Sequence, residues 1–201
     1  MIIGITGFYG AGKDTAADYL VRRKNFIHRS LSDVLRQEAA KRGIEPTREN
    51  LLKTGVDLRA KKGWGVLAEI VLEDINPDGD YVITSIRHPD EIKRLAAERN
   101  FFLVNIEAPV EIRFERLKKR NRPGDPSTIE ELNVMEKRET TVSGPGQQLG
   151  VCAGMADYNI DNSDNNFETL YRRMDQLVEM LKNKIALPPT TSIGKSGRVS
   201  L

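Results

Sequence analysis

The stretch GFYGAGKDT, residues 7–15, limits what this chain can fold into more than any other feature of the sequence. It follows the short apolar run of residues 1–6, which predicts a buried strand, and it precedes a run of helical composition. Its spacing, Gly7-x-x-x-x-Gly12-Lys13, is that of a phosphate-binding loop, in which backbone N–H groups and a helix N-terminus surround a phosphate. The alternative is a glycine-rich strand-to-helix turn in another kind of α/β protein.

The loop departs from the usual pattern at Asp14, where most such loops carry Ser or Thr. The usual hydroxyl is a ligand of Mg²⁺, and a carboxylate is also a hard oxygen ligand that can hold the ion directly or through water. Thr15 offers a hydroxyl one residue later. We expect both residues to bind Mg²⁺ and Lys13 to reach the β- and γ-phosphates of ATP. The residues expected to bind the nucleotide are Gly7, Gly10, Ala11, Gly12, Lys13, Asp14 and Thr15.

Short apolar runs alternate with helical runs along the chain. The alternation predicts a parallel sheet with right-handed crossovers and with helices on both faces. We expect one domain over residues 1–185, and a flexible tail over 186–201 that is rich in Pro, Ser, Thr and Gly. The expected strands are 1–6, 26–30, 81–86, 101–108 and 156–162, and the expected helices are 15–23, 34–43, 48–62, 66–75, 90–100, 110–140 (interrupted at 121–126) and 167–185.

Polar side chains follow the first three predicted strands. Gly7 comes after the first strand, residues 30–33 end and follow the second, and Arg87 follows the third. Because ligands of such sheets bind outside the carboxyl ends of the strands, we expect these residues to lie at one edge of the sheet, facing the loop.

Composition excludes several classes of protein. A formal charge of +2 on 201 residues gives no net attraction to nucleic acid or to membranes. No apolar run approaches the ~18 residues of a membrane span, and the chain start lacks a signal-peptide pattern. The single cysteine, Cys152, excludes an internal disulfide framework and is expected to be buried. His28 and His88 lack metal-ligand spacing, so we expect both to be structural. We therefore expect a cytoplasmic protein that binds neither nucleic acid nor membrane.

Several segments, taken together, resemble a known family. They span about residues 2 to 180 and are GFYGAGKDTAADYL, SLSDVLRQEA, PTRENLLKTGVDLRAKKGWGVLA, SIRHPDEIKRL, IEAPVEIRFERLKKR and MADYNIDN. The combination resembles the P-loop nucleoside monophosphate kinase group, most nearly archaeal adenylate-kinase-related proteins and GKDT-type deoxynucleoside monophosphate kinases. The resemblance implies a three-layer P-loop kinase fold with a small helical lid at about 113–140. It also implies ATP-dependent phosphoryl transfer to a (deoxy)nucleoside monophosphate, by a monomer or homodimer acting on small-molecule nucleotides.

The resemblance assigns roles to residues on the acceptor side. SDVLR is similar to the segment whose arginine holds the acceptor's phosphate, which is Arg36 here, with Ser32 and Asp33 beside it. SIRHP is similar to the segment that supplies a second such arginine, Arg87. Two guanidinium groups suit one phosphate, because each binds phosphate oxygens as a bidentate fork. The alternative for Arg36 is a solvated helix residue.

The resemblance also assigns a lid on the donor side. RFERLKKRNRPGD is similar to the arginine-rich start of the lid that closes over the donor phosphates. Arg116, Arg120 and Arg122 are the catalytic candidates, because phosphoryl transfer depends on alignment and on positive charge around the moving group. Arg138 is a further candidate. A run of this kind is equally compatible with a solvated helix face.

One part expected from the resemblance is missing. Related proteins usually carry an acidic residue late in the third strand, where this chain has Thr84 and Ser85. Asp33 is the best substitute, either for the water shell of the metal or as acceptor of the substrate's proton, although helix capping explains it as well.

Two alternatives to a nucleoside monophosphate kinase therefore stay open. One is a dephospho-coenzyme-A-type kinase, which shares the loop and the fold. The other is a nucleotide-binding regulatory module with weak or lost catalysis, motivated by the residues found at positions 14, 84 and 85.

Overall fold

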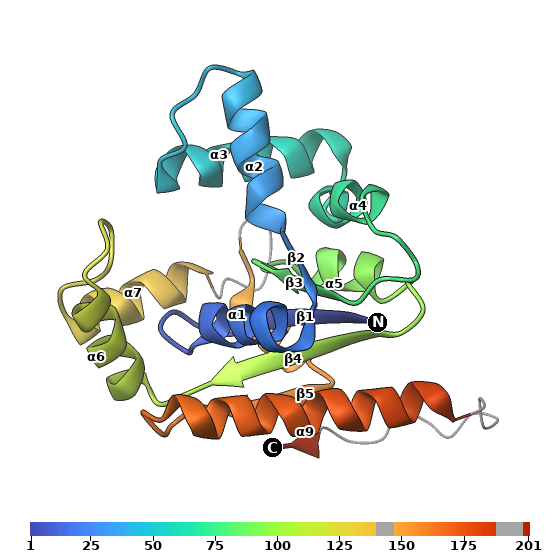
Figure 1. Cartoon of the computed structure of the whole chain (residues 1–201). Helices are drawn as coiled ribbons and strands as arrows, with labels where there is room; N and C mark the ends of the chain where they lie inside the picture. Colours follow the sequence, from blue (N-terminus) through green and yellow to red (C-terminus); the bar gives the residue numbers. More distant parts are fainter. Residues whose placement is uncertain (140–146, 188–198) are drawn as a thin grey trace.

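The computed structural model describes residues 1–139, 147–187 and 199–201. In these residues six strands, all parallel to their neighbours, form one sheet in the order β2-β3-β1-β4-β5-β6 (Figure 1). This confirms the predicted central parallel sheet. The strands are β1 (Ile2–Thr6), β2 (Ile27–Ser30), β3 (Tyr81–Thr84), β4 (Phe101–Glu107), β5 (Tyr158–Asp161) and β6 (Val199–Ser200).

Helices flank this sheet and connect its strands. Most of them occur where helical composition predicts them, and the sheet with its flanking helices confirms the predicted α/β fold. None of the described helices is both long and apolar enough to cross a membrane. The helices are α1 (Lys13–Lys24), α2 (Leu31–Lys41), α3 (Arg48–Lys62), α4 (Val66–Glu73), α5 (Pro89–Leu95), α6 (Val110–Arg120), α7 (Ile129–Glu139), α8 (Leu149–Gly154) and α9 (Phe167–Ala186).

Alternation along β1 and β4 divides the core between the two faces of the sheet. Ile3 and Ile5 of β1 pack in one cluster with apolar residues of α1 and α9. Ile2 and Leu103 pack on the opposite face, in a cluster that includes residues of α2, α4, α5 and α8. Successive side chains of a strand point to opposite faces, so strands covered on both faces need apolar residues at every position. All five residues of β1 are buried, as this account requires.

Two element boundaries differ from the prediction for local reasons. The strand expected over 81–86 ends at Thr84, because Ser85 adopts a left-handed conformation with φ 63° and turns the chain out of the strand. The helix expected over 90–100 begins at Pro89 and ends at Leu95. His88 caps its N-terminus, since its side chain accepts a hydrogen bond from the backbone of Asp90 at 3.1 Å.

The carboxyl-terminal segment was only partly predicted. Helix α8 has no counterpart among the expected elements, and the expected tail of 186–201 begins at the last residue of α9. Residues 188–198 lie outside the described part of the chain. Val199–Ser200 forms β6, which pairs with β5. This pairing satisfies backbone groups of β5 that would otherwise be unpaired at the edge of the sheet.

Candidate functional site

The loop after β1 packs closely against backbone carbonyl groups of α6 and β4. Gly10 has φ 72° and Gly7 has φ 139°, a region that L side chains rarely adopt. A Cβ atom on Gly10 would also collide with the carbonyl of Arg113 in α6, and one on Gly7 with the carbonyl of Ile106 in β4. Both glycines are therefore required by conformation and by space, and the loop packs directly against α6 and β4.

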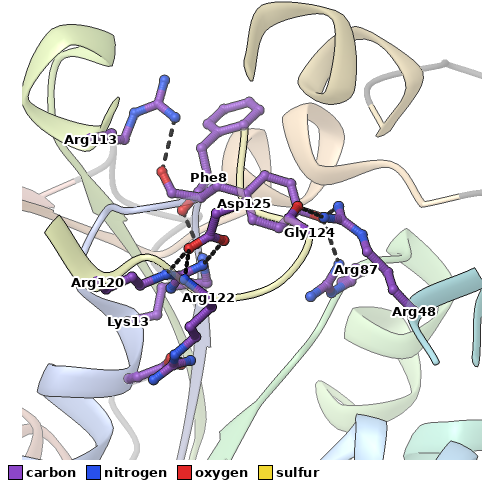
Figure 2. Close-up of polar contacts among 11 residues, drawn as sticks. Phe8, Lys13, Arg48, Arg87, Arg113, Arg120, Arg122, Gly124 and Asp125 are labelled. Atoms are coloured by element: carbon purple, nitrogen blue, oxygen red, sulfur yellow. Dashed lines mark hydrogen bonds and ion pairs between the residues drawn. The ribbon is translucent and has the colours of Figure 1, made fainter. Parts of the chain in front are cut away.

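Lys13, the first residue of α1, turns back onto the loop. Its ammonium group donates a hydrogen bond to the carbonyl oxygen of Phe8 at 2.7 Å (Figure 2). Burial of the ammonium group, together with the positive charge of Arg87, lowers the pKa of Lys13 from 10.5 to about 8. The group therefore lies in a positive environment, which an anionic ligand would relieve.

A cavity of about 1380 Å³ opens beside the loop. It is larger than the roughly 300–1,000 Å³ of sites that hold one small ligand, so it has room for two. Among the residues expected at the site, Gly7 and Ala11 do not line this cavity, although both belong to the loop. Those that do line it are Gly10, Gly12, Lys13, Asp14, Thr15, Ser32, Asp33, Arg36, Arg87, Arg116, Arg120 and Arg122.

Arg116 of α6 holds the loop to the segment that follows β5. Its guanidinium donates to the carbonyl oxygens of Asn162 at 2.7 Å and Asp164 at 3.1 Å, and to that of Gly10 at 3.4 Å. The buried Asn162 side chain in turn donates to the carbonyl of Ala11 at 2.7 Å. Sequence reasoning missed Asn162, although it is the last residue of a predicted strand and directly follows β5.

Arg120 and Arg122 lie near the turn between α6 and α7. Arg120 binds both carboxylate oxygens of Asp125, each at 2.7 Å, and this pairing lowers the pKa of that carboxyl. The Arg122 guanidinium lies 3.9 Å from the carboxylate of Asp14, and both side chains are largely exposed. These contacts place the arginine-rich segment over the start of α1 (Figure 2). The side chain of Arg138, the further candidate, lies outside the described residues.

Ser32, Asp33 and Arg36 follow β2 on the first turns of α2. Arg36 donates to the Asp33 carboxylate at 2.6 Å and to the Ser32 hydroxyl at 2.9 Å, and its side chain is exposed. The helix cap is Ser30 rather than Asp33, so capping does not explain Asp33. Arg36 and Arg87 line the same cavity, but the contacts of Arg36 are with its own helix.

Arg87 contacts the loop itself. It donates to the hydroxyl of Tyr9 at 3.1 Å and to the side-chain oxygen of Gln147 at 2.6 Å. The fully buried carboxylate of Glu91 accepts hydrogen bonds from the backbone N–H groups of Arg87 at 2.9 Å and His88 at 3.0 Å. These contacts fix the backbone from which the Arg87 side chain extends.

Hydroxyl groups occupy the end of β3 where an acid was expected. Thr84 Oγ1 lies 2.8 Å from His28 Nε2, and the Ser85 hydroxyl lies 3.0 Å from that of Ser30 and 3.3 Å from that of Ser32. His28 is exposed and lines the cavity, whereas His88 is buried and stacks on Trp64. Cys152 is buried as expected, and burial raises the pKa of its thiol to about 12.

The residues at the start of α1 suit a hard cation. The Asp14 carboxylate is exposed beside the cavity, and the Thr15 hydroxyl follows it. The described residues include no group of three or more His, Cys, Asp or Glu able to hold a metal by themselves. Mg²⁺ at a nucleotide needs only one or two protein ligands, because it keeps several waters and binds the phosphates, so the residues present fit this ion.

The loop at the carboxyl edge of a parallel sheet, facing an arginine-rich cavity, defines a P-loop nucleotide-binding protein with a kinase-like fold. The chain belongs to the AAA domain family, whose model matches residues 6–133, and to the UPF0200 proteins. It is 31% identical to the UPF0200 protein of Thermococcus kodakarensis over 192 residues, which cover 92% of this chain and 100% of that protein. It is 33% identical to the UPF0200/UPF0201 protein of Archaeoglobus fulgidus over 96% of this chain, but spans only 59% of that protein.

Solved structures share the fold at low sequence identity. TT1252 from Thermus thermophilus matches with a TM-score of 0.58 and 21% identity, over 90% of this chain and 97% of that one. Shikimate kinase from Bacteroides thetaiotaomicron matches with a TM-score of 0.53 and 17% identity, over 90% of this chain and 98% of that one. These matches support the P-loop kinase fold, and they leave the substrate to be argued from the site.

Proposed function

We propose that this protein transfers the γ-phosphoryl group of ATP to a (deoxy)nucleoside monophosphate. One observation carries the proposal. Lys13 of the loop and Arg87 after β3 line the same cavity, and the positive charge of Arg87 helps to lower the pKa of Lys13. Phosphoryl transfer requires two anionic phosphates to be brought together and aligned, with positive charge around the moving group. A cavity lined by cations from the loop and from the segment after β3 supplies that positive charge.

The loop forms the donor half of the proposed site. Its backbone N–H groups bind the phosphates of ATP, and Lys13 exchanges the Phe8 carbonyl for the β- and γ-phosphates. Mg²⁺, when bound, neutralises phosphate charge, and Asp14 and Thr15 would hold it. Asp33, on the facing wall, would bind the metal's water shell or accept the acceptor's proton.

The segment of about 113–140 acts as the lid of the proposed site. It comprises most of α6, all of α7 and the turn between them, and the buried ion pair of Arg113 with Glu136 fastens the two helices together. Arg116, Arg120 and Arg122 approach the donor phosphates from this segment. Closure of such a lid excludes water and completes the set of charges around the transferred group.

The acceptor half is the wall made by Ser32, Asp33, Arg36 and Arg87. Arg87 binds the acceptor's phosphate, and the α2 residues contact the nucleotide that carries it. We propose further that the protein is related to adenylate-kinase-like and GKDT-type enzymes. We also propose that it acts in the cytoplasm, as a monomer or a homodimer. The second candidate is a regulatory module with weak catalysis. It is kept because Thr84 and Ser85 carry hydroxyl groups at the end of β3, where related proteins usually have an acidic residue.

An acceptor screen tests the proposal. ATP consumption with Mg²⁺ would be followed against each nucleoside and deoxynucleoside monophosphate, with dephospho-coenzyme A and shikimate as the other acceptor classes. We expect turnover with at least one monophosphate, and no turnover by Lys13→Ala with any acceptor. Turnover with dephospho-coenzyme A alone would reassign the acceptor. ATP binding without turnover on any acceptor would favour the regulatory module.

A further inference from the structure

Two arginines from distant parts of the chain meet at one residue of the phosphate-binding loop. The Tyr9 hydroxyl accepts a hydrogen bond from Arg48 at 2.6 Å and another from Arg87 at 3.1 Å. Both guanidinium groups also lie over the Tyr9 ring, at 4.9 Å and 5.7 Å from its centroid. Arg48 is the first residue of α3, and Arg87 follows β3 (Figure 2). The loop residue therefore brings two cations together beside the place where the donor phosphates would lie.

Arg48 also reaches the proposed lid. Its guanidinium lies 3.4 Å from the carbonyl oxygen of Gly124, in the turn next to Asp125. Arg48 thus stands where the loop, the lid and the α3 segment meet, and it lines the same cavity as Lys13. An anion at this point would face the end of the donor triphosphate, which is the position that in-line transfer requires of an acceptor phosphate.

Arg36, the expected partner of Arg87, is engaged elsewhere. It is exposed and bonded to Asp33 and Ser32 on its own helix, whereas Arg48 shares the Tyr9 hydroxyl with Arg87. Phosphate oxygens accept charge-assisted hydrogen bonds from guanidinium groups, so two arginines that meet at one point can bind one phosphate. The Tyr9 hydroxyl contacts both guanidinium groups.

We propose that Arg48 and Arg87 together bind the phosphate of the acceptor, with Tyr9 as the positioning residue between them. This inference rests on the proposed function, and it names the residues that bind the phosphate of the acceptor. It adds Arg48 and the loop residue Tyr9 to the acceptor half of the site. Arg36 then contacts the acceptor away from its phosphate.

Binding of ribose 5-phosphate, a phosphate monoester without a base, tests the proposal. The loop would first be saturated with AMP-PNP and Mg²⁺, so that the added phosphate reports on the second site, and binding would be followed by ³¹P NMR. Ribose and acetate are the matched ligands without a phosphate. We expect the wild-type protein to bind ribose 5-phosphate in preference to both, and the control variant Lys53→Gln to bind AMP-PNP as the wild type does.

Arg48→Gln should weaken ribose 5-phosphate binding about 10- to 100-fold, the range for loss of a charge-assisted hydrogen bond. Tyr9→Phe keeps the ring and should weaken it about 3- to 10-fold, because both hydrogen bonds to the Tyr9 hydroxyl are lost while the two guanidinium charges remain. Lys53→Gln is the matched control, since Lys53 lies on the same helix, is exposed, pairs with Glu49 and does not line the cavity. Arg48→Lys, which keeps the charge without the fork, should recover part of the affinity.

Several results would overturn the proposal. One such result is that Arg48→Gln binds ribose 5-phosphate as tightly as the wild type while Arg36→Gln binds it much more weakly. That result would assign the acceptor's phosphate to Arg36 and Arg87. Equal affinity for ribose and ribose 5-phosphate would show that this cluster binds no phosphate. If AMP-PNP failed to bind the wild-type protein, the proposed function would fail instead, and the same titration without AMP-PNP would still report on Arg48. Thermal unfolding of Arg48→Gln and Lys53→Gln distinguishes lost binding from lost fold.

Discussion

The ammonium group of Lys13 lies 2.7 Å from the carbonyl oxygen of Phe8, so the phosphate-binding loop is closed on its own lysine. Burial and the charge of Arg87 lower the pKa of this lysine to about 8, against 10.5 in an unfolded chain. Between these two values the folded protein holds fewer protons than the unfolded one. The free energy of unfolding therefore rises with pH between about pH 8 and 10.5. Below about pH 8, burial of the charged Lys13 ammonium group destabilises the folded protein by its full amount.

A bound triphosphate reverses this shift. Its negative charge favours protonated Lys13, so ATP binding should take up a proton near pH 8, and affinity should fall as pH rises through that value. Titration calorimetry in buffers of different ionisation enthalpy measures the proton directly. Lys13→Arg is the control, because arginine stays charged throughout and should give no uptake. Equal proton uptake in both proteins would assign the proton to another group.

Asp14 should set the dependence on magnesium. If its carboxylate holds the ion, Asp14→Ala should raise the Mg²⁺ concentration needed for ATP binding about tenfold, the size of effect expected for loss of one charged ligand. Stability should change by less than about 0.5 kcal/mol, because the side chain is exposed. Asp14→Ser should restore most of the metal dependence, since Ser is the residue that most such loops carry. An unchanged magnesium requirement in both variants would mean that Asp14 only favours the helix dipole.

Alanine substitutions at Gly10 and Gly43 distinguish two effects on stability, the strain of a left-handed backbone and the steric overlap of a Cβ atom with a neighbour. The two have nearly equal φ angles, 72° and 66°, but only a Cβ at position 10 would meet another residue, the carbonyl of Arg113. Gly43→Ala should cost about 1 kcal/mol from the left-handed conformation alone. Gly10→Ala should cost a further ~1–3 kcal/mol of overpacking and should also weaken ATP binding. Urea unfolding measures both, and equal losses would contradict a tightly packed loop.

Arg120 must exchange the Asp125 carboxylate for a phosphate if it serves the donor. The pair is bidentate at 2.7 Å but lies near the surface, where such pairs contribute about 0.2–1 kcal/mol. Asp125→Asn should therefore strengthen ATP binding about 2- to 5-fold, because the competing anion is gone. Arg120→Gln should weaken it. A loss of affinity in Asp125→Asn equal to that in Arg120→Gln would mean that the pair shapes the lid instead.

Much of this fold is predictable because its strands are covered on both faces. Continuous apolar runs such as residues 1–6 and 101–104 indicate buried strands, and the order of strands and helices then indicates a parallel sheet. The same rule placed Gly7 and Arg87 at one edge. The pairing of β6 with β5 was unpredictable, because two residues carry no periodic signal and depend on an edge formed elsewhere in the chain.

The side-chain partners within the site were less predictable. Arg48 lies in a charged segment where each arginine is equally compatible with a solvated helix face, and only the tertiary structure brings it to Tyr9. The rule that found Arg87 applies equally to Asn162 after β5, and so could have identified it. Asp33 was expected to hold the water shell of the metal or to accept the substrate's proton. Its ion pair with Arg36 at 2.6 Å was not expected, although the i, i+3 spacing of the two residues could have indicated it.

The fate of the γ-phosphoryl group is the most direct test of the central claim. The protein would be mixed with γ-³²P-labelled ATP, Mg²⁺ and each monophosphate in turn, and the label followed by chromatography. The account predicts that the label moves onto one or more of the monophosphates to give the labelled nucleoside diphosphate, with little release as inorganic phosphate, and that Lys13→Ala abolishes the transfer. Label that appears only as inorganic phosphate would show an ATPase without an acceptor, and would contradict the assignment of this cavity to phosphoryl transfer.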